Sequence, residues 1–132
     1  MSNGIILPEL SGYANLRVFC IFIQEVFTAL GDFYIRSAVC PINKLWKVTY
    51  SSFGHNNGVV SNCLYELETS ADVRIGIIAM YPSLTKAETK NVFATLWVAQ
   101  NQKLAVRFTV TTTSPTCWFY ASVEEYDYGG SL

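Results

Sequence analysis

The alternation of apolar and polar residues along most of this chain has the period of two that is typical of half-buried β-strands. In the segment 104–113, large apolar residues alternate with small or polar ones, and many of them are β-branched. Trp46, Val48 and Tyr50 occupy every second position of another such segment. The pattern predicts strands at 46–51, 59–68, 92–99, 104–113 and 117–126.

Two of the segments between these strands have the composition of tight turns. Asn57 and Gly58 follow the first predicted strand, and Asn-Gly is a strong hairpin signal because both residues tolerate a positive φ angle. Residues 100–103 are a polar stretch that separates the third and fourth predicted strands. We therefore expect two β-hairpins, with His55 exposed to solvent at the tip of the first.

The remaining segments differ in how clearly they indicate a structure. The apolar run at 73–80 predicts a strand buried on both faces, and the polar segment 85–91 predicts a loop. Residues 33–40 predict a further strand. Residues 16–23 favour a strand because most of them are aromatic or β-branched, although 15–30 also satisfies the pattern of a capped helix.

Together these elements predict an all-β fold. Seven or eight short strands in 132 residues fit one domain, spanning 1–132, with a short N-terminal helix as an open alternative. An antiparallel β-sandwich, of jelly-roll or immunoglobulin type, accommodates this number of strands. A closed lipocalin-type barrel is the alternative architecture.

The composition is unusually poor in charge. Charged residues make up 14% of the chain, against about 25% in an average soluble domain, and the net charge is −1. The aromatic content of 14% excludes a disordered chain, and the absence of a basic excess argues against binding nucleic acid through a basic patch. Either the surface is largely neutral and polar, or a partner covers part of it.

The cysteines indicate no metal site or disulfide framework. All four lie in apolar runs without a CxxC pair, which predicts reduced, buried thiols and no zinc site. They are Cys20, Cys40, Cys63 and Cys117. The sequence contains neither a signal-peptide pattern nor a membrane-spanning apolar run, so we expect intracellular synthesis or a virion component, and no cofactor.

Acidic residues and the one histidine are the candidates for chemistry. A nucleophilic mechanism would have to use His55, and Glu66 and Glu68 lie on one face of a predicted strand, where like charges can raise a pKa. No complete catalytic set is recognisable, and we expect no enzyme. The acidic residues near the C-terminus are the candidate calcium ligands, although their spacing matches no EF-hand; they are Glu124, Glu125 and Asp127.

Aromatic side chains are the candidates for binding a partner or a ligand. Along the last predicted strand, Trp118, Tyr120 and Tyr126 fall on one face, while the apolar residues between them fall on the other. Both faces cannot point into one core, so one of them is expected to face a packed partner or a bound ligand. The interface or ligand-contact candidates are Trp118, Tyr120, Tyr126, Trp97 and Trp46.

These observations predict a structural subunit that assembles into a homo-oligomer or a larger body. By analogy of architecture, a viral-coat-like shell protein is the most concrete form, although the sequence has no basic arm to contact a genome. The alternative is a lectin-like or lipocalin-like module that binds a carbohydrate or small ligand in a pocket lined by Trp and Tyr.

Overall fold

The fold is all-β, as the sequence predicts. The computed structural model describes residues 17–56, 60–82, 89–111 and 115–128, and these residues form nine strands and no helix. The helix considered for residues 15–30 is therefore wrong where the structure describes that segment. The strands are β1 (Arg17–Val26), β2 (Gly31–Arg36), β3 (Lys44–Asn56), β4 (Val60–Thr69), β5 (Arg74–Tyr81), β6 (Thr89–Val92), β7 (Leu96–Val98), β8 (Gln102–Val110) and β9 (Thr116–Asp127).

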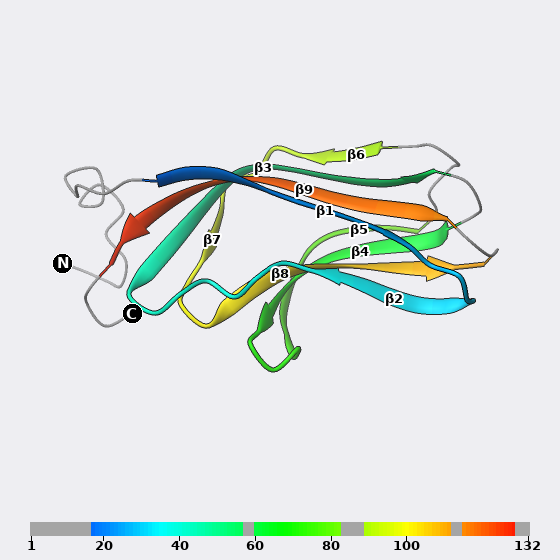
Figure 1. Cartoon of the computed structure of the whole chain (residues 1–132), viewed down its shortest axis with the longest axis horizontal. Coiled ribbons are helices and arrows are strands. Elements are labelled where there is room, and N and C mark those ends of the chain that lie inside the picture. Colours follow the sequence, from blue (N-terminus) through cyan, green and yellow to red (C-terminus); the bar gives the residue numbers. More distant parts are fainter. Residues whose placement is uncertain (1–16, 57–59, 83–88, 112–114, 129–132) are drawn as a thin grey trace.

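The strands form two antiparallel sheets that pack face to face (Figure 1). Sheet A has the order β1-β9-β3-β6, with β7 also paired to β3, and sheet B has the order β2-β8-β4-β5. The antiparallel pairs are nested: β4 pairs with β5, β3 with β6 and β7, β2 with β8, and β1 with β9. Such nesting is that of a long hairpin rolled into two sheets, which is the jelly-roll arrangement.

The number of strands exceeds the predicted seven or eight because one predicted strand is interrupted. The segment 92–99 divides into the end of β6 and the separate strand β7, which both pair with β3. Residues 89–91, which the sequence predicts as part of a loop, belong to β6 instead. The rest of that predicted loop, 85–88, lies outside the described residues.

Both predicted hairpins are wrong. β3 belongs to sheet A and β4 to sheet B, so the chain crosses between the sheets where a hairpin was expected, and Asn57 and Gly58 lie outside the described residues. β7 and β8 likewise belong to different sheets. A local turn signal does not distinguish a connection within a sheet from a connection between sheets.

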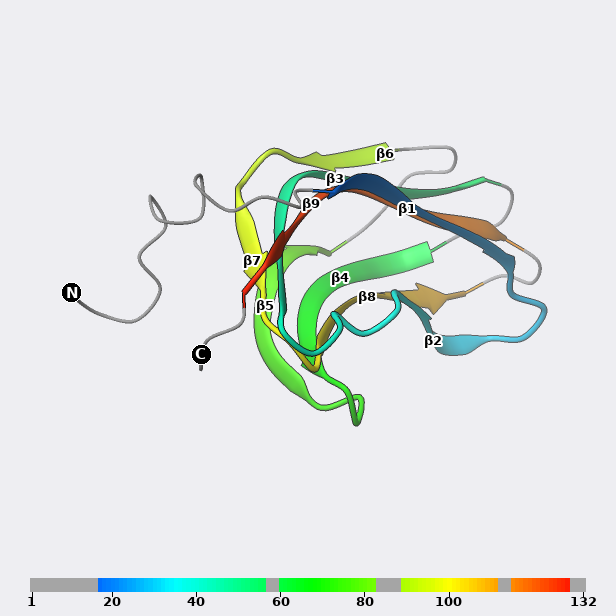
Figure 2. The same cartoon turned by 60° about the vertical axis from the view of Figure 1, so that its left-hand side comes forward.

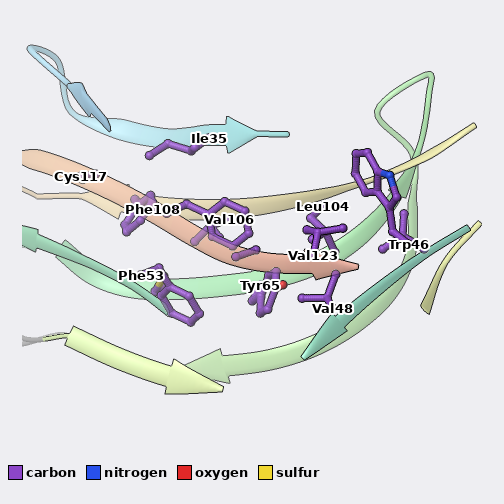
Figure 3. Close-up of a cluster of buried hydrophobic side chains, with 14 of the residues drawn as sticks. Ile35, Trp46, Val48, Phe53, Tyr65, Leu104, Val106, Phe108, Cys117 and Val123 are labelled. Carbon is purple, nitrogen blue, oxygen red and sulfur yellow. The ribbon is translucent and has the colours of Figure 1, made fainter. Parts of the chain in front are cut away.

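The core fills the space between the two sheets (Figure 3). Phe53 and Phe119 point inward from sheet A, and Tyr65 and Phe108 point inward from sheet B. The Tyr65 ring lies 5.6 Å from the Phe53 ring and 5.4 Å from the Phe119 ring. The Tyr65 hydroxyl shares a 2.7 Å hydrogen bond with the hydroxyl of Ser51, which satisfies this polar group inside the core.

The strand β5 differs from its prediction. The apolar run was expected to be buried on both faces, but β5 is the last strand of sheet B and exposes Ile75, Ile77 and Met80. Figure 2 shows β4 and β5 bending together, with the turn between them projecting beyond the other strands. The apolar run therefore packs one face against the core and leaves the other uncovered by the described residues.

Candidate interaction surface

The outer face of sheet A is organised by the alternation along β9. Phe119, Ala121 and Val123 are buried in the core, while Trp118 and Tyr120 lie on the opposite, half-buried face, as the sequence predicts. The register carries this alternation to the neighbouring strands, because residues directly opposite one another share a face. The outer face of sheet A thus combines every second side chain of β1, β9 and β3.

Four aromatic side chains cross this face, and we call them the aromatic row: Phe22, Tyr120, Tyr50 and Phe93. Phe22 of β1 lies directly opposite Tyr120 of β9. The Tyr50 ring of β3 lies 5.9 Å from the Tyr120 ring and 5.1 Å from the Phe93 ring. Phe22 is 60% exposed and Phe93 is 76% exposed. The row therefore presents apolar surface from four segments that are distant in the sequence.

A second aromatic group lies on the same face, closer to the end of β9. The Trp97 ring of β7 lies 6.4 Å from the Tyr126 ring, and Lys47 Nζ lies 5.9 Å from the centroid of the Trp97 ring. The Tyr126 hydroxyl donates a 2.9 Å hydrogen bond to Glu124 Oε1. Partial burial and this contact with Glu124 raise the pKa of Tyr126. Lys47 and Glu124 face each other across β3 and β9, so this end of the face is more polar than the aromatic row.

One thiol lies beside the aromatic row. Cys20 is exposed on β1, which contradicts the expectation that all four cysteines are buried. Its Sγ lies 3.0 Å from the Tyr120 hydroxyl, and this hydrogen bond raises the pKa of Tyr120. Cys20 is outward because strand alternation places it between the inward residues Phe19 and Ile21.

The other three cysteines are buried thiols, as predicted, and all four are free in the structure. Burial raises the pKa of Cys40 and of Cys117 to about 12, and it also raises the pKa of Cys63. A thiol with such a pKa carries almost no thiolate at neutral pH, so these three side chains act as small apolar groups of the core.

The outer face of sheet B has the opposite character. Glu68 is fully buried there and accepts a 2.9 Å hydrogen bond from Arg36 Nε, and Glu66 accepts one of 2.9 Å from Arg74 Nε. Asp72 forms an ion pair with Lys103 and lies 3.5 Å from Arg36 Nε. Several charged side chains on this face are thus paired with opposite charges, whereas Arg107 of β8 contacts Asn62, and the edge strand β5 exposes Ile77 and Met80.

The carboxylate pair considered for acid–base chemistry belongs to this charged network. Glu66 and Glu68 lie on one face of β4, as predicted, and both are buried. Burial and a hydrogen bond with Glu68 raise the pKa of Glu66, while the Arg74 guanidinium opposes that shift. Each carboxylate already has an arginine partner, which fits a structural role.

His55 is not at an exposed turn tip, and that expectation is wrong. It lies near the end of β3, directly opposite Cys117 of β9, and it is buried. The strand continues to Asn56 because β9 provides pairing partners as far as Thr116. The side chain consequently points into the sandwich instead of toward solvent.

The predicted acidic cluster does not converge on one point. Glu124 lies on the outer face of sheet A, while Glu125 is buried and accepts a 2.8 Å hydrogen bond from Nε1 of Trp46. Asp127 forms an ion pair with Lys44 at the end of the strand. Among the described residues, no group of three or more His, Cys, Asp or Glu side chains is placed to hold a metal ion.

The interface candidates therefore divide into two sets. Trp118, Tyr120, Tyr126 and Trp97 lie on the outer face of sheet A. Trp46 is only 3% exposed and packs in the core beside the edge of the Phe19 ring, at 5.6 Å between centroids, so it is not part of this face.

Sequence reasoning missed three members of the aromatic row. The alternation puts Tyr50 on the face of Trp46 and Val48, but a β-bulge between Val48 and Tyr50 inserts one residue and turns Tyr50 outward. Alternation along β1 could have identified Phe22, because it shares a face with Val18 and Cys20. Phe93 follows β6, and nothing in its local sequence indicates its contact with Tyr50.

Two further observations concern ligands and membranes. In the ranges that the structure describes, there is no pocket of the kind that the ligand-binding alternative predicts. None of the described residues form a helix of the length and apolarity needed to cross a membrane.

No protein-family model and no curated protein matches this chain. Solved structures with similar folds include a protein of the Bacillus endospore appendages, which are disulfide-linked pili, with a TM-score of 0.51 at 9% identity, covering 86% of this chain and 88% of that one. A chain of infectious bursal disease virus, Gx strain, gives a TM-score of 0.48 at 12% identity, and a capsid chain of cyanophage Pam1 gives 0.37 at 11%.

The extent of these matches differs. The cyanophage match covers 94% of this chain and 91% of the capsid chain. The bursal disease virus match covers 91% of this chain but only 34% of the viral one, so this chain spans about a third of that protein. At these identities, the likeness to the pilus protein shows a common fold and nothing further.

Proposed function

We propose that this protein is a non-enzymatic structural subunit that associates with further copies of itself through the outer face of sheet A. The observation that carries the proposal is the difference between the two outer faces of the sandwich. Sheet B combines ion pairs such as Arg36–Glu68 with apolar residues exposed along its edge strand β5, whereas sheet A presents the aromatic row across four segments.

The outer faces of sheets A and B differ in how well they are suited to contact with water or with a protein partner. On the outer face of sheet B, Arg36 and Asp72 remain partly exposed and each lies beside an opposite charge, so this part of the face is suited to contact with water. The exposure of large aromatic groups such as Phe22 and Phe93 to water is unfavourable, and such groups are typical of the centre of an interface. Tyr and Trp also supply contact area at a small cost in side-chain entropy, which suits Trp118 and Tyr120 to this role.

The low charge of the whole chain agrees with the same proposal. A chain with 14% charged residues has few groups with which to keep both faces soluble, and most of the ion pairs among the described residues lie on sheet B. The fold is also similar to that of a pilus protein, which is a subunit of a larger assembly. A shell or fibre subunit is the form of assembly we favour.

The test introduces a charge into the aromatic row. Tyr120→Asp should reduce association at least tenfold, because an interface has to desolvate the new carboxylate. The matched control is Val73→Asp, since Val73 is an apolar, 59% exposed residue beside β5 and away from sheet A. Sedimentation velocity of the two variants and the natural protein measures the effect.

Circular dichroism and thermal unfolding establish that both variants are folded. If Tyr120→Asp associates as strongly as the natural protein, the outer face of sheet A is not the interface. If Val73→Asp weakens association to the same degree, the effect is a general response to surface charge and the proposal fails.

A further inference from the structure

We propose that the edge of β1 pairs with the β1 edge of a second copy in the antiparallel orientation, so that sheet A continues across a two-fold axis. The inference rests on the proposed function, because it names the strand through which two copies first meet. It commits to a second copy as the partner, and it predicts a dimer that can be recognised separately from any larger assembly.

The edge of β1 lacks several of the features that normally keep an edge strand from pairing, and its charged residues stand only near its two ends. Within the part of the chain that the structure describes, β1 pairs with β9 alone, and it lies at the end of the order of sheet A (Figure 1). It is ten residues long and contains no proline, no lysine and no bulge. Val18, Phe22 and Val26 expose apolar surface along it.

The charges of β1 are complementary to those of a second copy in one orientation. The strand has two charged residues, Arg17 at its beginning and Glu25 near its end, and both are exposed. In an antiparallel pair of identical strands, Arg17 of each copy can lie opposite Glu25 of the other. A parallel pair in register would instead place like charges opposite one another, which is destabilising.

The same charges select one register. When Arg17 faces Glu25 of the second copy, Cys20 faces Phe22, and Ile21 lies on the two-fold axis opposite its own copy. A shift by two residues separates the opposite charges. A shift by one residue pairs the outward side chains of one copy with the core-facing side chains of the other. Arg17 also forms a 3.1 Å ion pair with Glu125, and its five N–H donors leave enough for a second carboxylate.

This pairing would extend the aromatic row. Phe22 is the member of the row on β1, so the two-fold axis brings two such rows next to each other on one continuous face. Main-chain hydrogen bonds would then supply the orientation of the two copies, and the joined aromatic faces would supply a larger surface for further assembly.

The first test exchanges the charges. Glu25→Lys alone and Arg17→Glu alone should each weaken dimerisation about tenfold, because like charges then face each other at both ends of the pair. An equimolar mixture of the two variants should dimerise as strongly as the natural protein, since each position 17 again faces an opposite charge at position 25. Sedimentation velocity with one variant fluorescently labelled measures the mixed dimer.

The second test does not depend on Arg17, whose change also removes the ion pair with Glu125. In the proposed register, Phe22→Cys places a thiol opposite Cys20 of the second copy, and directly opposed residues have the spacing that a disulfide requires. Mild oxidation should convert this variant to a covalent dimer. Gln24→Cys is the control, because position 24 faces Val18 and should not cross-link.

The outcomes separate this inference from the proposed function. The inference would be overturned if Glu25→Lys still formed large assemblies, mixing the variants had no effect and Phe22→Cys gave no covalent dimer. Self-association itself would then remain intact. A cross-linkable, charge-dependent dimer that never grows further would support the inference and contradict the larger assembly. A natural protein that stays monomeric would contradict both.

Discussion

At the scale of single residues, the buried carboxylates of β4 show how this protein tolerates charge away from water. Glu68 is fully buried, and its two oxygens lie 2.9 Å from Nε and 3.5 Å from an Nη atom of Arg36. Partial burial opposes the charge of Arg36, but the hydrogen bond and charge of Glu68 outweigh it and raise the pKa of Arg36. Arg36 is therefore held in its charged form beside Glu68.

This geometry predicts a large effect of a small change. Glu68→Gln should lower the free energy of unfolding by about 2 kcal/mol, because it leaves the guanidinium of Arg36 with a weaker acceptor in a partly buried site. Urea denaturation of the variant measures this loss.

The matched control is Glu25→Gln, since Glu25 is an exposed carboxylate of β1. It should change the stability of the fold by no more than about 0.5 kcal/mol when measured at a concentration where the protein is monomeric. Equal effects of the two substitutions would show that the buried ion pair contributes nothing particular to stability.

At the scale of elements, β9 connects the core with the proposed interface. It is the central strand that pairs with both β1 and β3, and its side chains alternate between the interior and the outer face of sheet A. Phe119 and Tyr120 are neighbours in the sequence and face opposite directions. One strand thus supplies the core with one set of residues and the proposed interface with the other.

This division of roles can be measured with one pair of variants. Phe119→Ala should destabilise the fold by about 3–5 kcal/mol, because it leaves a cavity between Tyr65 and the rest of the core. Tyr120→Ala should cost about 1 kcal/mol or less while weakening association. Thermal unfolding and sedimentation of both variants compare the two properties, and a loss of stability in Tyr120→Ala equal to that in Phe119→Ala would contradict the assignment of faces.

The elements also indicate how far local sequence can predict this fold. Regular alternation identified the strand type and the two faces of β9, because each depends on neighbouring residues only. The pairing of strands depends on contacts between distant segments, so the Asn-Gly signal predicted a hairpin where the chain changes sheets. The apolar run of β5 did not reveal which face is covered, because that depends on the strand's place at the edge of sheet B.

The candidate surface was partly predictable for the same reason. Trp118 and Tyr120 followed directly from the alternation of β9. The position of Tyr50 did not, because the bulge after Val48 is a feature of the pairing with β9 and has no clear signal in the sequence. Trp46 is indistinguishable in sequence from an interface residue, and only the structure shows its indole N–H donating to buried Glu125.

At the scale of the whole molecule, the sandwich has two outer faces with different chemistry. The ion pairs of sheet B provide its buried carboxylates with partners within one copy, so these carboxylates need no second copy. The aromatic row of sheet A and the edge of β1 lie next to each other, because Phe22 belongs to both. A subunit of this kind would associate with a definite polarity, with sheet A toward its neighbours and sheet B toward solvent.

The central claim, that this protein associates with itself, is tested most directly by the mass of the purified natural protein in solution. Light scattering over a wide range of concentrations should show species heavier than the 14.8 kDa chain, growing through a dimer toward larger assemblies as the concentration rises. A mass that remains at 14.8 kDa at every concentration would contradict the account.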